Sequence, residues 1–209
     1  MLEDSIMRYR GWLILADLHI GYERELEEKG YNIPSQTKDM LRRIRELKKK
    51  ERRLLILGDL KHNIPEFSLQ EMKEVPYFVR RLKELFDRVV IIKGNHDGDI
   101  EKLVDVEVLK EFRVGRVGFL HGHARPSDEL LERVKTLVIG HIHPVYKYED
   151  SLGHPVFKSC WLMGRWRDKK VIVMPAFNPL FTGSQELTGP FAKEMEVEEI
   201  ILTDLIKIV

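Results

Sequence analysis

The sequence of 209 residues predicts an α/β fold. Short apolar runs alternate along the chain with charged stretches whose apolar residues recur at helical spacing, which is the pattern of strands alternating with helices. Apolar residues make up 43% of the chain, a share typical of globular proteins, and no linker divides it. A chain of this length buries a sizeable core, so we expect residues 1–209 to form a single domain.

The first half of the chain supplies three expected strands and three expected helices. The strands are Trp12–Ala16, Leu54–Leu57 and Val89–Lys93, and the helices are Glu23–Lys29, Gln36–Lys50 and Gln70–Phe86. Ser35 is the expected N-cap of the second helix, in which Met40, Ile44 and Leu47 recur at helical spacing. Pro76 lies within the third helix and is expected to mark a break, because proline lacks the N–H that a helix interior needs.

The second half of the chain is expected to be richer in strands. The candidates are Val104–Leu109, Val117–Leu120, Leu137–Ile139, Val156–Leu162, Val171–Met174 and Glu199–Ile208. Cys160 is the single cysteine and lies in one of these apolar runs. A disulfide within the chain is therefore excluded, and we expect a buried, unreactive thiol.

Histidines are concentrated where the expected strands end. Seven of the eight histidines follow a strand directly or lie in the loop behind it, and His154 is the exception. The seven are His19, His62, His96, His121, His123, His141 and His143. Because ligands bind beyond the carboxyl ends of strands in open α/β sheets, we expect five strands to deliver these side chains to one crevice.

Carboxylate and amide side chains accompany the histidines at the same strand ends. Asp17, Asp59 and Asn95 lie in the segments LILADLH, LLILGDLKH and VVIIKGNHD. Imidazole, carboxylate and amide ligands without a thiolate suit Mn, Fe or Zn. So many ligands are too many for one ion, whereas two ions that share a bridging carboxylate use them all. The sequence therefore predicts a two-metal site.

Each of these motifs has a structural explanation when it stands alone. The segment GNHD is compatible with a tight turn, GHIH is compatible with a surface loop, and a single D-x-H pair is weak evidence for a metal. Five such segments that each follow an apolar strand are much harder to explain by chance. Their joint occurrence favours the metal site.

The segments ADLH, GDLKH, GNHD, HGH and GHIH resemble the ordered motifs of the calcineurin-like metallophosphoesterases. The resemblance implies a four-layer α/β/β/α sandwich and two divalent metal ions, with Mn favoured and Fe, Zn or Ni as alternatives. The segments ADLHIGYERELEEKGYNIP and PAFNPLFTGS extend it to a prokaryotic branch. That branch includes archaeal phosphoesterases related to DNA-repair nuclease subunits and the ligase-associated DNA-damage-response endonucleases.

The family pattern implies a set of metal ligands in this chain. One metal would be bound by Asp17, His19 and His143, the other by Asn95, His121 and His141, and Asp59 would bridge them. His123 is the rival of His121, because either histidine of HGH could face the metals. Relatives with HGG at this place keep only the first, which favours His121 and puts His123 behind it or near the substrate.

His62 departs from the family pattern. Many relatives carry an acidic residue or Asn three positions after the bridging Asp, and this chain has His62 there. The histidine could bind a phosphate, orient a metal ligand or serve a purely structural purpose. All three alternatives stay open from the sequence.

The resemblance implies hydrolysis of a phosphate ester. A hydroxide that bridges the metals would attack phosphorus, and His96 would donate a proton to the leaving alkoxide. Asp97 is expected either to orient the ring of His96 or to cap the turn that follows. Some proteins of this fold are weakly active scaffolds that bind partners and have lost such residues. His96 and every expected ligand are present here, which favours an enzyme.

The substrate follows less directly from the sequence. We expect phosphodiesters, with DNA or RNA as candidates, and phosphomonoesters as the alternative. The basic stretch Arg42–Arg53 could follow a nucleic-acid backbone, or could be a solvated helix face because Glu46 and Glu51 interrupt it. Trp161 and Trp166 could stack on bases or lie in the core or a dimer interface. The segment PAFNPLFTGS is expected to shape access to the site.

Composition bears on partners and location. No apolar run approaches the roughly 20 residues that span a bilayer, and the N-terminal MLEDSIMRYR lacks the apolar core of a secretory signal. We therefore expect a cytoplasmic protein that is not associated with a membrane. The 33% of charged residues, rich in Lys and Glu, fits a thermophile. A homodimer is compatible with the sequence. Any ATPase or helicase partner would be a separate chain, because no G-x-x-x-x-G-K-[ST] motif is present.

Overall fold

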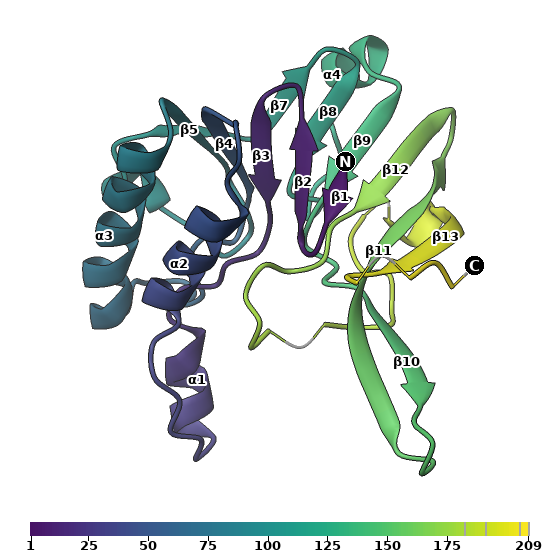
Figure 1. Ribbon diagram of the computed structural model, residues 1–209. Coiled ribbons are helices and arrows are strands. Elements are labelled where there is room, and N and C mark those ends of the chain that lie inside the picture. Colours follow the sequence, from purple (N-terminus) through teal and green to yellow (C-terminus); the bar gives the residue numbers. More distant parts are fainter. Residues whose placement is uncertain (182, 191, 205, 209) are drawn as a thin grey trace.

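The computed structural model describes residues 1–181, 183–190, 192–204 and 206–208, and two mixed β-sheets form its centre (Figure 1). The first sheet has the order β1-β2-β3-β4-β5-β6. Its strands are Leu2–Glu3, Ile6–Tyr9, Trp12–Leu15, Arg53–Leu57, Arg88–Ile92 and Glu107–Leu109. The second sheet has the order β10-β11-β12-β9-β8-β7, with β13 paired to β11. Its strands β7 to β13 are Glu111–Val114, Val117–Leu120, Thr136–Ile139, Val145–Glu149, Pro155–Trp166, Lys169–Val173 and Glu196–Leu202.

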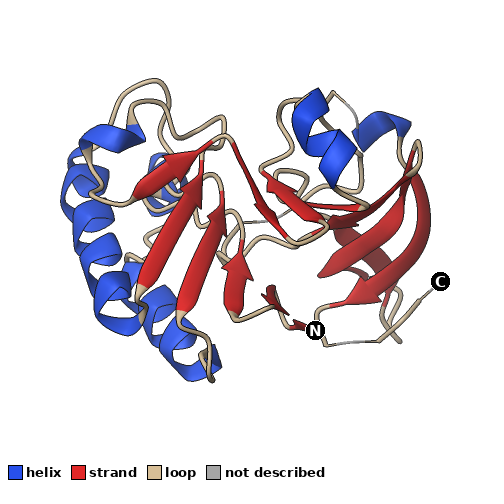
Figure 2. Ribbon diagram, turned by 90° about the horizontal axis from the view of Figure 1, so that it is seen from above, coloured by secondary structure: helices blue, strands red, loops and turns tan. Residues whose placement is uncertain are grey.

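Helices cover the outer faces of the two sheets, so the molecule has four layers in the order α/β/β/α (Figure 2). The helices α2 (Thr37–Leu47) and α3 (Leu69–Leu85) lie on the first sheet. The short helix α4 (Asp128–Arg133) and a 3-10 turn at Ala192–Glu194 lie on the second. Helix α1 (Tyr22–Glu28) projects beyond the first sheet, and a further 3-10 turn spans Ile100–Lys102 (Figure 1). The expected four-layer sandwich is confirmed.

Three apolar cores correspond to the three interfaces between these layers. Along β4, Leu54 and Ile56 pack outward against the helices, whereas Leu55 and Leu57 pack inward between the sheets. This alternation follows from the two-residue period of a strand. Both faces are buried, which explains why the strand reads as a continuous apolar run. Cys160 lies in the core of the second sheet, 1% exposed, and burial raises the pKa of its thiol to about 12.

Two expectations about the helices are wrong. Gln36 and not Ser35 is the N-cap of α2. The Ser35 hydroxyl accepts from the Thr37 amide at 3.3 Å and donates to Glu74 Oε2 at 2.8 Å, which ties the start of α2 to α3. Helix α3 continues without interruption through Pro76. Its face of Val75, Phe78 and other buried residues packs on the first sheet, and that burial outweighs the roughly 3 kcal/mol that an internal proline costs.

Other differences from the expected elements concern short elements and the last strand. The hairpin of β1 and β2 and the helix α4 were not expected from the sequence, because each is too short to show a clear period. The last expected strand, Glu199–Ile208, is β13, which begins at Glu196 and ends at Leu202 before a turn at 203–204. Leu205 of that expected strand lies outside the described residues. Among the described residues, no helix is long and apolar enough to cross a bilayer.

The carboxyl ends of parallel strands from both sheets meet at one edge of the sandwich. Strands β3, β4 and β5 are parallel in the first sheet, and β8, β9 and β12 are parallel in the second. The loop after β12 crosses to the loop after β3, where the amides of Phe177 and Asn178 donate to the carbonyls of Ala16 and Asp17 at 2.8 and 3.3 Å. The histidine-rich loops are thereby gathered at one place.

Candidate metal centre

The backbone turns sharply at the strand ends that carry the expected ligands. Nine described residues other than glycine adopt a positive φ, and five of them are Asp17, His19, Asp59, His141 and His143, with φ between 44° and 68°. Such left-handed conformations cost of order 1–3 kcal/mol each when they are strained, and they cluster at functional sites. These backbone conformations lower the stability of the fold, and they orient the five side chains at the strand ends.

Two glycines allow the carboxylates to approach the backbone closely. A Cβ atom at position 94 would lie 2.1 Å from Asp59 Oδ1, and one at position 140 would lie 2.6 Å from Asp17 Oδ2. Both distances are far below van der Waals contact, so any side chain at position 94 or 140 would collide with a carboxylate of the centre. This gives a reason for the glycines in GNHD and GHIH beyond the turns that the sequence suggested.

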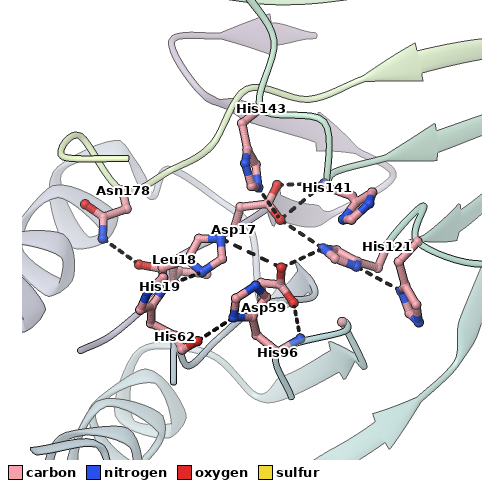
Figure 3. Close-up of polar contacts among 12 residues, drawn as sticks. Asp17, Leu18, His19, Asp59, His62, His96, His121, His141, His143 and Asn178 are labelled. Atoms are coloured by element: carbon pink, nitrogen blue, oxygen red, sulfur yellow. Dashed lines mark hydrogen bonds and ion pairs between the residues drawn. The ribbon is translucent and has the colours of Figure 1, made fainter. Parts of the chain in front are cut away.

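A first group of side chains with the geometry of a metal site joins Asp17, His19, Asp59 and His143 (Figure 3). One candidate ligand atom from each lies within 4.8 Å of the others. The Nε2 atom of His143 lies 3.2 Å from Asp17 Oδ1, and that of His19 lies 3.7 Å from Asp59 Oδ2. Both nitrogens are buried and make no hydrogen bond. Buried polar atoms are rarely left unpaired, so these nitrogens fit a cation between them and the carboxylates.

A second group joins Asp59, His121 and His141, so Asp59 belongs to both (Figure 3). The His121 Nε2 atom lies 3.0 Å from Asp17 Oδ1 and 3.3 Å from Asp59 Oδ2. Asn95 is exposed and lines a cavity together with His121. The two groups match the ligand sets that the family pattern implied, with Asp59 in both, except that Asn95 belongs to neither group.

The electrostatics of the centre follow from two buried carboxylates that lie close together. Burial lowers the pKa of His121, but hydrogen bonds to Asp17 and Asp59 outweigh it and raise that pKa to about 10. Burial raises the pKa of Asp59, yet the His121 partner brings it down to about 2. Burial lowers the pKa of His19 and brings that of His141 to about 4. Ionised Asp59 beside neutral His19 and His141 forms a donor set suited to divalent cations, and His121 must release its proton to bind one.

His96 lies on the His19 side of the centre. Its ring is 5.0 Å from that of His19, and its backbone amide donates to Asp59 Oδ1 at 2.9 Å. Its Nδ1 atom contacts the carbonyl oxygen of His62 (Figure 3). A carbonyl only accepts, so Nδ1 donates there and Nε2 is the nitrogen left for exchange with a substrate.

Asp97 makes no hydrogen bond to the ring of His96. Its Oδ1 accepts from the amides of Leu60 and Lys61 at 2.9 and 3.3 Å, and its Oδ2 accepts from the Gly94 amide at 2.9 Å. Burial, together with the charge of Asp59, raises the pKa of Asp97 to about 6. The expectation that Asp97 orients His96 is therefore not met in this geometry. Its carboxylate ties the loop after β5 to the loop after β4.

His62 connects an expected metal ligand to a carboxylate. Its Nε2 atom lies 2.7 Å from Glu25 Oε2. Its Nδ1 atom lies 3.3 Å from His19 Nδ1 (Figure 3). Glu25 only accepts, and burial lowers the pKa of His62, so the neutral ring donates through Nε2 and accepts through Nδ1. His19 then donates through Nδ1 and keeps a lone pair on Nε2, which faces Asp59.

His123 lies behind His121 in a similar way. The two Nδ1 atoms are 3.0 Å apart, and His123 is exposed whereas His121 is 1% exposed. Of the two rivals, only His121 points a ring nitrogen at Asp17 and Asp59. This geometry favours His121 as the ligand and His123 as its outer partner.

The segment 175–184 packs against the metal centre with residues whose roles were not assigned from the sequence. The ring of Phe181 stacks on His19, with centroids 4.0 Å apart and planes within 7°. It lies edge-to-face with the ring of His143, with centroids 4.6 Å apart. The side-chain amide of Asn178 donates to the Leu18 carbonyl at 2.8 Å (Figure 3). Thr182 lies outside the described residues. The segment PAFNPLFTGS was visible in the sequence, but nothing in it indicated which ring would cover the histidines.

The residues outside the centre that the sequence suggested for nucleic-acid binding have structural roles. Trp161 and Trp166 are 0% and 2% exposed, so of the alternatives left open by the sequence the core role is the one that the structure supports. Basic residues of the stretch 42–53 pair with acids of neighbouring elements. These pairs are Arg43 with Asp4, Lys49 with Glu3 and Arg52 with Asp87. They favour the reading of this stretch as a structural, solvated helix face.

Comparison with known proteins agrees with this geometry. The family model of calcineurin-like phosphoesterases matches residues 12–195, well over half of the chain. No curated protein matches the sequence. Among solved structures, nuclease MPE of Pseudomonas putida is similar with 23% identity and a TM-score of 0.66, over 98% of this chain and 91% of that one.

Two further solved structures are more distant. Protein AQ665 of Aquifex aeolicus, of unknown function, has 21% identity and a TM-score of 0.45, over 63% of this chain and 78% of that one. The phosphoesterase Yfce of E. coli has 19% identity and a TM-score of 0.44, over 79% of each chain. The family match covers nearly all the strands that deliver the histidines and carboxylates, and on that ground the chain belongs to the calcineurin-like phosphoesterase family.

Proposed function

We propose that this chain is a dinuclear phosphodiesterase that acts on nucleic acid. Membership of the family makes it a hydrolase of phosphate esters. The observation that carries the dinuclear part is Asp59, whose carboxylate belongs to both groups of candidate ligands. Mn is the favoured metal, with Fe, Zn or Ni as alternatives, because the donors are imidazoles and carboxylates.

Two divalent cations would supply a water of lowered pKa and would neutralise the charge of the phosphate oxygens. The residues of the chain then have separate tasks. Asp17 and Asp59 provide anionic charge, and the hydrogen bond to His62 fixes the ring of His96. When the ring of His96 is protonated on both nitrogens, its Nε2 atom is the proposed donor of a proton to the leaving oxygen, which a diester needs because an alkoxide is a poor leaving group.

Nucleic acid is the proposed substrate class on two grounds. Nuclease MPE of Pseudomonas putida shares the fold over nearly the full length of both chains. The centre also opens beside a cavity of about 650 Å3, which leaves room for more than the scissile phosphate. Phosphomonoesters are the alternative substrate. A homodimer, a separate ATPase or helicase partner and a cytoplasmic location stay predictions.

A reconstitution experiment tests the substrate class. The metal-stripped protein is loaded with Mn, Ni, Zn or Mg and assayed on bis-p-nitrophenyl phosphate, p-nitrophenyl phosphate, cyclic nucleotides, and single- and double-stranded DNA. We expect hydrolysis of the model diester and of DNA with Mn. Hydrolysis of the monoester alone would sink the proposal that the enzyme is a nuclease.

The substitution His96→Ala tests the proposed proton donor. We expect kcat on DNA to fall about 100- to 10,000-fold while both metals remain bound, because general acid catalysis contributes about that factor. Bis-p-nitrophenyl phosphate should lose less activity, because its nitrophenolate leaves without a proton from an acid. His96 also forms a group of metal-ligand geometry with His19 and His62, so metal content must be measured beside turnover. Loss of a metal would make His96 a ligand. His154→Ala, at an exposed histidine between β10 and β11 that belongs to none of the candidate ligand groups, is the matched control.

A further inference from the structure

We propose that the cavity beside Asn95 and His121 binds a backbone phosphate of a polynucleotide strand next to the bond that is cleaved. This inference rests on the proposed phosphodiesterase function and names how that site would hold a polymer. The cavity has a volume of about 650 Å3, within the range of small-molecule sites. It is continuous with the candidate metal centre, because Asn95, His121 and His123 form part of its wall.

Three separate segments build the cavity. Lys93 to Gly98 follow β5, Lys110 and Glu111 join β6 to β7, and His121 to Ser127 follow β8. The cavity therefore lies across the edges of both sheets, next to the metal centre on the His121 side. His96 does not line it. A strand that enters the centre can thus continue into the cavity without displacing His96.

The charges of the wall favour an anion. Lys93, Lys110 and Arg125 contribute three cations, whereas Glu111 is the one acid among the lining residues. Both oxygens of Glu111 are used by Ser127, with its amide at 3.1 Å and its hydroxyl in close contact. The acid is therefore already engaged within the wall, and the three cations dominate the open space.

The three cations differ in what already holds them. Lys93 pairs with Glu101 at 2.8 Å, and Arg125 pairs with Glu194, in both cases at the exposed surface. Lys110 is exposed and has no ion pair or hydrogen-bond partner among the described residues. Surface ion pairs contribute little, so a phosphate can compete for the paired cations and meets no competitor at Lys110. Substitution of Lys110 is therefore the most direct test of phosphate binding in the cavity.

The test compares a small diester with a polymer in Lys110→Glu. Bis-p-nitrophenyl phosphate reaches only the metal centre, whereas an oligonucleotide also extends into the cavity. Single-stranded DNA and RNA of the same sequence are the two polymer probes, which separate the two sources of a phosphodiester backbone. The measured quantity is the ratio of kcat/KM for each polymer to kcat/KM for the small diester, with Mn. Lys73→Glu, on the exposed outer side of α3, makes the same change of charge away from the cavity.

We expect the ratio to fall on the order of ten-fold in Lys110→Glu for the polymer that wild type cleaves, and to stay at the wild-type value in Lys73→Glu. Lys110→Ala should also weaken the dependence of polymer cleavage on salt, by a slope of about 0.7, because one phosphate contact is lost. An unchanged ratio, or an equal fall in both charge-reversal variants, would overturn the phosphate subsite. Cleavage of the small diester but of neither polymer by wild type would overturn it as well. Failure of wild type to cleave the small diester would instead reject the proposed phosphodiesterase function.

Discussion

At the scale of single residues, His62 lies directly behind His19, a candidate metal ligand. It links Glu25 to the ring of His19 through two contacts of 2.7 and 3.3 Å. Partners of this kind fix the tautomer and the orientation of a ligand and raise its basicity. Of the alternatives left open by the sequence, the orienting role is the one that these contacts support.

The substitution His62→Ala should weaken metal binding about 10- to 100-fold, because His19 loses the partner of its Nδ1 atom. Calorimetric titration of the metal-stripped protein with Mn measures this directly and does not depend on turnover. His154→Ala, at an exposed histidine, should bind Mn as wild type does. Wild-type affinity in His62→Ala would mean that the histidine has only a packing role.

The sequence predicted the residues of the centre better than their contacts. Asp17, His19, Asp59, His121, His141 and His143 converge because each directly follows an apolar strand, which is visible in the sequence. The backbone-binding role of Asp97 was not predictable, since it depends on how close Gly94 lets two loops approach. The stack of Phe181 on His19 joins residues far apart in the chain, and no local pattern records it.

At the scale of elements, the start of α3 fixes the loop that carries His62. Ser68 and Glu71 form a capping box, in which the Ser68 hydroxyl accepts from the Glu71 amide and the Glu71 carboxylate accepts from the Ser68 amide. Glu71 Oε1 also accepts from the amides of His62 and Asn63, at 2.9 and 2.6 Å. The cap of a helix and the position of a site residue therefore depend on one buried carboxylate.

Loss of this cap should be measurable as stability. We expect Ser68→Ala to lower the free energy of unfolding by about 1 kcal/mol, because a helix N-cap contributes roughly that amount. Urea denaturation of the metal-stripped protein gives the value. Ser151→Ala, in an exposed turn, is the control and should cost almost nothing. An equal effect of the two substitutions would show that the box does not stabilise α3.

Among the elements, long apolar or strongly periodic segments were predicted well and short ones were not. The strands β3, β4 and β5 lie within a residue or two of their expected positions, because both faces are buried and the runs are continuous. Helix α3 was expected to break at Pro76, but it continues past this residue because its buried face packs on the first sheet. Ser35 lies one residue before the N-cap of α2, although its hydroxyl accepts from the Thr37 amide, and its bond to Glu74 joins residues too far apart for the local sequence to show.

At the scale of the whole molecule, the candidate metal centre joins the two sheets. Asp17, His19 and Asp59 come from the first sheet, whereas His121, His141 and His143 come from the second. The α/β class was predictable from alternation, but the four layers followed from the family resemblance. Nothing in the spacing of apolar runs shows that the chain divides into two facing sheets. That one domain spans residues 1–209 stays a prediction.

The proposed ligands of each metal come from both sheets, so one folded chain should hold two divalent ions that share Asp59. Mass-spectrometric metal analysis of Mn-loaded protein, after removal of free ions, measures this most directly. We predict two Mn ions per wild-type chain and at most one in Asp59→Ala, with diester hydrolysis lost in the variant. One ion or none in wild type, or two retained in Asp59→Ala, would contradict the account.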